Sequence, residues 1–133
     1  MKVSTYKEYS KVYDFFSNEI LFPQCIRFIE KVSEYVLPQD KVTDVGGGTG
    51  FFTDRLINIK PDINITFVEP SREMINLAKK RLPHKTIFLN QFFDEVLNCL
   101  SAQDIFIFQR SLYSFYYNIS DYRELAKRLY DIT

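Results

Sequence analysis

All four glycines of this 133-residue chain lie in one short stretch, DVGGGTGFF, from Asp44 to Phe52. Glycine tolerates positive φ angles and lets the backbone approach another group closely, but it loses more conformational freedom on folding than any other residue. A chain that gathers all of its glycines in one place therefore brings that backbone against something. We interpret the stretch as a ligand-binding loop.

A carboxylate follows this loop at a spacing typical of nucleotide binding. Glu69 comes nineteen residues after Gly50 and ends a β-branched run that is typical of a strand. In open α/β sheets an acid at about this distance accepts hydrogen bonds from the two hydroxyls of a ribose. The alternatives are that Glu69 is only a strand-end carboxylate near a helix N-terminus, and that Asp44 only caps the turn after it.

The glycine spacing excludes two common nucleotide loops. A dinucleotide loop, G-x-G-x-x-G/A, needs a small third residue, but Phe51 or Thr53 stands there; a P-loop needs a lysine after its last glycine, and none follows. The pattern that remains is an acid two residues before G-x-G-x-G, namely Asp44, Gly46, Gly48 and Gly50. This pattern resembles motif I of the class I S-adenosylmethionine-dependent methyltransferases, and FVEPS, residues 67–71, resembles their motif II.

The resemblance implies a role for each of these residues. S-adenosylmethionine carries a sulfonium and a zwitterionic methionine tail, so Asp44 would place negative charge near the ammonium group, directly or through water. Glu69 would bind the ribose hydroxyls, and Pro70 would lie beside the adenine. After the third strand, Asn90 or Gln91 would meet the adenine amino group, with Phe92 stacking on the ring. The family often has an aspartate at that point, and the sequence does not choose between the two residues.

Two further segments resemble the family less specifically. Gln109, in FQRSLY, corresponds to the segment that meets the methionine amino group. Residues 1–40 resemble an N-terminal helical cap, from which Tyr9 or Tyr13 would reach the cofactor carboxylate. For these tyrosines the simpler interpretation, a buried ring with a solvated hydroxyl, is favoured.

Strands alternate with helices along the chain, which predicts an α/β fold with a parallel, Rossmann-like sheet and helices on both faces. We expect strands at residues 41–45, 63–69, 85–90 and 104–108. We expect helices at residues 6–20, from Cys25 to Pro38, at 50–59, from Ser71 to Leu82, at 94–100, and from Ser120 onward, the last buried through Leu125, Ala126 and Leu129.

Composition narrows the class of protein. Seventeen basic residues balance seventeen acidic ones, which favours a small-molecule acceptor over nucleic acid. The N-terminus lacks the apolar core of a signal peptide, and no apolar run is long enough to cross a membrane, so we expect a cytoplasmic protein. Cys25 and Cys99 are not in a metal-ligand spacing and His84 stands alone, so no metal site is expected.

The family fold usually has seven strands, and this chain ends after the helix that follows the fourth. We therefore expect a single domain, residues 1–133, apparently truncated, with strand order 3-2-1-4. Strand 104–108 is apolar throughout, so its open edge is expected to be covered by a second copy, by residues 113–118 or by a C-terminal partner chain. Two functions follow: a methyltransferase whose catalytic residues the sequence does not identify, or a non-catalytic cofactor-binding or interaction module completed by another chain.

Overall fold

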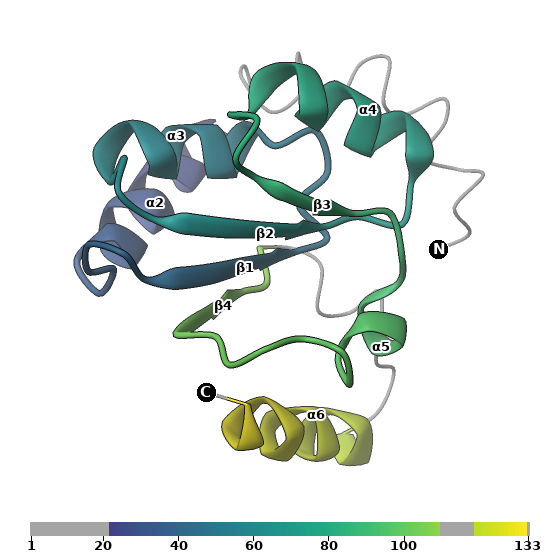
Figure 1. Cartoon of the computed structure of the whole chain (residues 1–133). Coiled ribbons are helices and arrows are strands. Elements are labelled where there is room, and N and C mark those ends of the chain that lie inside the picture. The colour runs from purple at the N-terminus through teal and green to yellow at the C-terminus, as the bar shows by residue number, and fades with distance from the viewer. Residues whose placement is uncertain (1–21, 110–118, 133) are drawn as a thin grey trace.

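The computed structural model describes residues 22–109 and 119–132 and is shown in Figure 1. Its sheet has four parallel strands in the order β3-β2-β1-β4. These strands are β1 (Lys41–Val45), β2 (Asn64–Val68), β3 (Ile87–Leu89) and β4 (Ile105–Ile107). The predicted α/β fold and the predicted order 3-2-1-4 are confirmed.

Helices lie on both faces of the sheet, as predicted. They are α2 (Phe22–Ser33), α3 (Phe51–Ile59), α4 (Arg72–Arg81), α5 (Phe93–Val96) and α6 (Ile119–Asp131). Helices α2, α3 and α4 lie on one side of the sheet, and α5 and α6 lie on the other (Figure 1). Because side chains alternate along each strand, the two helical layers bury different strand residues.

Each layer has its own apolar core. Ile65 and Phe67 of β2 pack with Leu56 of α3 and Ile75 of α4 in the first core. In the second core, strand residues that point to the opposite face of the sheet pack with residues of α5 and α6 and with Leu97, which follows α5. The members of this core are Val45, Val68, Phe93, Val96, Leu97 and Leu125. This alternation leaves Asp44, between Thr43 and Val45, on the face that α3 covers.

A local signal explains where α4 begins. The Ser71 side chain accepts a hydrogen bond from the Met74 amide, so it is the N-cap of α4, at the residue where the helix was expected to begin.

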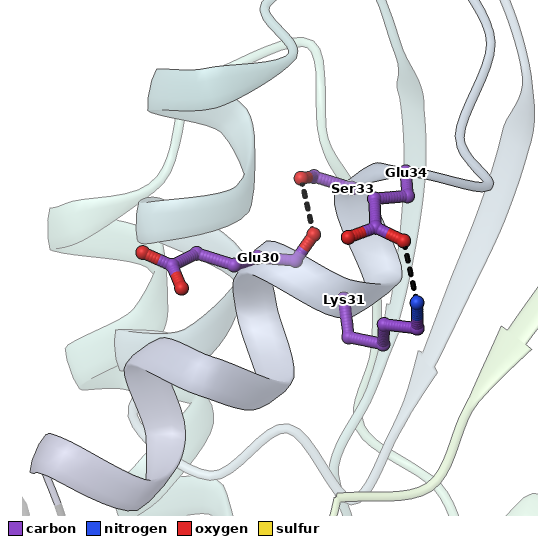
Figure 2. Close-up of polar contacts among 4 residues, drawn as sticks. All are labelled: Glu30, Lys31, Ser33 and Glu34. Carbon is purple, nitrogen blue, oxygen red and sulfur yellow. Dashed lines mark hydrogen bonds and ion pairs between the residues drawn. The ribbon is translucent and has the colours of Figure 1, made fainter.

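The C-terminal part of α2 carries two local polar contacts, shown in Figure 2. Ser33 Oγ donates to the Glu30 carbonyl at 2.7 Å, and Lys31 Nζ lies 2.6 Å from Glu34 Oε2. The lysine and glutamate side chains are largely exposed, and exposed pairs contribute little to stability. Glu34 is therefore a suitable position for a control substitution.

Several predicted boundaries are wrong. The strands expected at 63–69, 85–90 and 104–108 are shorter in the structure, where they pair over Asn64–Val68, Ile87–Leu89 and Ile105–Ile107. The last helix was expected to begin at Ser120, but Ser120 lies inside α6. Ala126, which was expected to be buried in that helix, is exposed.

Some predictions fall outside the described residues. The helix expected at 6–20 and the segment 113–118 both lie there, and the proposed cap, residues 1–40, is described only from residue 22. Within 22–109 and 119–132, no helix is long and apolar enough to cross a membrane. The same residues contain no cluster of three or more potential metal ligands.

Candidate functional site

The glycine loop, residues 46–50, connects the end of β1 to the start of α3. Gly46, Gly48 and Gly50 have φ angles of 70°, 62° and 80°, a region that side-chain-bearing residues rarely adopt. Gly47 is required for a different reason. A Cβ atom there would lie 2.2 Å from Cε2 of Phe67 and 2.9 Å from Oδ2 of Asp44. Three of the four glycines are therefore needed for backbone conformation, and one for space.

Glu69 lies against this loop, directly after β2. Its Oε2 accepts a hydrogen bond from the Gly48 amide at 2.9 Å, and its Oε1 accepts one from the Ser71 amide at 2.8 Å. Only 5% of the residue is exposed. Burial raises the pKa of Glu69 from 4.5 to about 7, the two backbone hydrogen bonds oppose this rise, and the nearby negative charge of Asp44 adds to it.

Asp44 lies beneath the loop and is the fourth residue of β1, directly before Val45. Its Oδ2 accepts a short hydrogen bond from the Thr53 hydroxyl of α3, and its side chain is buried. Burial raises the pKa of Asp44 from 3.8 to about 6, and the hydrogen bond from Thr53 partly offsets this rise. The loop is thus flanked by two buried carboxyl groups, both of which hold a proton more tightly than free carboxyl groups do.

Asn90 joins this arrangement from the end of β3. Its Nδ2 donates to the Glu69 carbonyl at 2.9 Å and to the Pro70 carbonyl at 3.0 Å. Both amide hydrogens are thereby directed at the turn between β2 and α4. Since an asparagine amide has two donor hydrogens and one acceptor oxygen, the remaining group, Oδ1, can only accept.

Comparison with solved structures identifies the fold to which this site belongs. The plantazolicin methyltransferase BpumL, solved with a monoazolic desmethylPZN analogue and SAH, superposes with a TM-score of 0.71 at 20% identity, over 92% of this chain and 48% of BpumL. A Methanococcus maripaludis protein, mmp1179, assigned to the S-adenosyl-L-methionine-dependent methyltransferases, gives 0.71 at 18% identity, over 92% and 58%. The chain has the fold of the S-adenosylmethionine-dependent methyltransferases.

The same fold also occurs in a protein named for a different reaction. The precorrin 8w decarboxylase of Methanobacterium thermoautotrophicum superposes with a TM-score of 0.61 at 17% identity, over 80% of this chain and 55% of that protein. The chain thus spans about half the length of these methyltransferase-fold proteins. No protein-family model matches the sequence, and no curated protein matches it. A shared fold does not fix the reaction, so function must be argued from the site.

The remaining predicted site residues occupy less connected positions in this methyltransferase fold. Phe92 is 40% exposed and immediately precedes α5, and Gln91 beside it is exposed. Gln109 is half-buried and follows β4, and since β4 runs parallel to β1, it lies towards the same edge of the sheet as the loop. Tyr9 and Tyr13 lie outside the described residues.

Two polar residues of the loop's surroundings were not predicted. Thr53 holds Asp44, and Arg81, the last residue of α4, donates from Nη1 to the Thr49 carbonyl at 3.2 Å and to the Thr49 hydroxyl at 3.0 Å. Arg81 belongs to a run of basic residues that ends α4, and such runs ordinarily complement the helix dipole. The sequence contains no signal that separates this arginine from the two lysines before it.

Proposed function

We propose that this chain binds S-adenosylmethionine in the glycine loop and transfers its methyl group to a small-molecule acceptor in the cytoplasm. The observation that carries the proposal is the pairing of Glu69 with Gly48. A buried carboxylate is bonded to the backbone of a loop that only glycine can form, at the carboxyl edge of a parallel sheet. That edge is where open α/β sheets bind nucleotide-like ligands.

The residues present fit this cofactor. Each oxygen of Glu69 accepts one backbone hydrogen bond and retains a second lone pair, so the carboxylate can also accept from two ribose hydroxyls. Asn90 presents an acceptor next to Pro70, which matches an adenine amino group. We therefore favour Asn90 over Gln91 as the adenine contact.

Asp44 would act on the cofactor indirectly. With its side chain buried and bonded to Thr53, it supports the underside of the loop and supplies negative charge without direct contact. The positively charged methionine end of the ligand would favour ionisation of this carboxyl group. The segment containing Gln109 would lie beside that end, and Tyr13 and Phe92 remain proposed contacts from the sequence.

When bound, the cofactor supplies an already activated methyl group: the bond from sulfonium sulfur to methyl breaks as the acceptor atom bonds to carbon, leaving a neutral thioether. The protein's part in such a transfer is to hold both reactants in line, which is an entropic contribution. An acceptor that starts as O–H or N–H also releases a proton, to solvent or to a base. We assign no base among the described residues.

The second candidate function is a cofactor-binding module without turnover. The observation that favours it is the coverage of the structural neighbours, since this chain aligns with 48% of BpumL and 58% of mmp1179. The site described above accounts for cofactor contacts and assigns none to an acceptor. In this case the β4 edge would be covered by a second copy or by a partner chain, as the sequence suggests.

Calorimetric titration with S-adenosylmethionine, its product S-adenosylhomocysteine and NAD tests the cofactor directly. We expect the first two to bind and NAD not to bind. Glu69→Ala should weaken binding by about 1–3 kcal/mol, the range for hydrogen bonds to a charged group, whereas Glu34→Ala should not. Equal affinity of wild type and Glu69→Ala would contradict the assignment of the ribose contact. Methyl transfer by the purified chain to any small acceptor would exclude the module without turnover.

A further inference from the structure

We infer that Arg81 is a positioning residue that holds the glycine loop in its ligand-binding conformation. The effect on ligand affinity rests on the proposed function, whereas the effect on the loop itself does not. One nitrogen of the guanidinium, Nη1, donates to both the carbonyl and the hydroxyl of Thr49. Thr49 is fully buried and lies in the middle of the loop, so these bonds fix its backbone and its side chain together.

The same guanidinium also contacts the residue on the other side of Gly50. Its central carbon lies 5.8 Å from the ring centroid of Phe51, the first residue of α3. A guanidinium over an aromatic face is attracted by the ring quadrupole. Arg81 therefore contacts both neighbours of Gly50, whose φ angle of 80° turns the chain into α3.

The last turn of α4 packs closely against this part of the loop. A Cβ atom on Gly50 would lie 3.1 Å from Leu82 and 3.3 Å from Ala78. At the opposite end of the helix, Glu69 precedes the Ser71 cap and bonds to the Gly48 amide. Consecutive loop residues, 48 and 49, are therefore bonded to groups at opposite ends of α4. A shift of either end of the helix would move the loop, and Arg81 forms hydrogen bonds that couple the loop to the C-terminal end.

This role differs from that of a cation at a helix end. Lysine would serve equally well for the helix dipole, because the dipole responds only to charge. A planar guanidinium can direct a nitrogen at two acceptors while its face lies on a ring, which an ammonium group cannot reproduce. Arg81→Lys thus separates the two roles, and Lys80→Ala, at an exposed position next to Arg81 on α4, is the matched control.

The first measurement is amide hydrogen exchange of residues 48–52 in the ligand-free protein. We expect Arg81→Lys to speed this exchange by about tenfold while amides in the middle of α4 keep their protection, and Lys80→Ala to change neither. Exchange at wild-type rates in Arg81→Lys would overturn the inference, since the loop would then hold its conformation without the guanidinium. This measurement needs no ligand, so it stands even where S-adenosylhomocysteine fails to bind the wild type.

The second measurement is a double-mutant cycle on affinity for S-adenosylhomocysteine. Thr49→Val removes the hydroxyl and keeps the shape of the side chain. We expect Arg81→Ala to weaken binding by roughly fivefold and Thr49→Val to weaken it by less, because only the hydroxyl bond is lost in the latter. The double variant should be only slightly weaker than Arg81→Ala, because that variant already lacks the hydroxyl bond. Fully additive losses in binding free energy would show that Arg81 and Thr49 act independently and would overturn the inference that Arg81 positions the loop through Thr49. Millimolar guanidinium should restore affinity in Arg81→Ala, whereas the same concentration of sodium should not.

Discussion

Replacing Glu69 by glutamine should lower stability at pH 4 and raise it at pH 8. In the folded protein the Glu69 carboxyl has a pKa of about 7, against 4.5 ordinarily, so the folded state binds the proton more tightly than the unfolded state does. The resulting stabilisation is fully present below pH 4.5 and is lost as the pH rises through about 7. Glutamine does not titrate and so removes this dependence.

The size of the effect follows from the pKa shift. A difference of about 2.5 pKa units at about 1.4 kcal/mol each corresponds to a loss of about 3 kcal/mol between low and high pH. Glutamine has one acceptor oxygen, so it can satisfy the Gly48 amide or the Ser71 amide but not both. The lost hydrogen bond should lower stability by about 1 kcal/mol relative to the wild type at a pH where Glu69 is protonated in both the folded and the unfolded state. The variant should therefore be less stable than wild type by about 1 kcal/mol at pH 4 and more stable by about 2 kcal/mol at pH 8.

Urea denaturation at pH 4, 5, 6, 7 and 8 measures this difference directly, with the midpoint and slope fitted at each pH. Glu34→Gln is the control, because Glu34 forms an exposed ion pair with Lys31 at the end of α2 (Figure 2). Its stability should run parallel to that of the wild type. The reasoning is refuted if Glu69→Gln also runs parallel to the wild type across this range, since the carboxyl at 69 would then titrate alike in both states.

Further predictions concern the same site. Affinity for S-adenosylhomocysteine should rise about tenfold from pH 6 to pH 8, because ribose hydroxyls bind the ionised form of Glu69; calorimetry that finds no such rise would place the ribose elsewhere. Gly47→Ala should lower stability by about 1–3 kcal/mol in urea, because its Cβ would overlap the buried Phe67 ring. Asn90→Asp should lower stability by about 1–3 kcal/mol, because a carboxylate would face two carbonyl oxygens, while Gln91→Glu should have little effect; equal effects would argue against the Asn90 contacts.

The glycine loop could be predicted from the sequence because its residue types are unusual for reasons that act locally. Positive φ at Gly46, Gly48 and Gly50 is a property of the loop backbone itself, so the spacing of the glycines identified the loop before any tertiary contact was known. The strand order followed in the same way from a resemblance that these residues carry. The structure confirmed both the parallel sheet and its order.

The strand boundaries could not be predicted in this way. Strand β3 pairs with β2 over only three residues, from Ile87 to Leu89, although a strand was expected over residues 85–90. How far two strands pair depends on the twist of the sheet and on the helices packed over it. Strand propensity in the sequence gives no information about either of these. The contacts of Thr53 and Arg81 could not be predicted for the same reason, because they also depend on tertiary packing. Their partners are 9 and 32 residues away and meet them only because α3 and α4 pack beside the loop.

The buried carboxyl group of Glu69 is costly for folding, and the proposed function gives a reason for it. In the absence of ligand, burial disfavours its charge, and the amides of Gly48 and Ser71 compensate only in part. Each oxygen still has a free lone pair, so two ligand hydroxyls can bind without breaking the bond that holds the loop. Those added donors stabilise the charged form of Glu69. Ligand binding therefore offsets the desolvation penalty of the buried carboxylate and lowers its pKa. A carboxylate placed only to anchor the loop would gain nothing from its raised pKa, whereas one placed to receive hydroxyl donors binds them more selectively because it is buried.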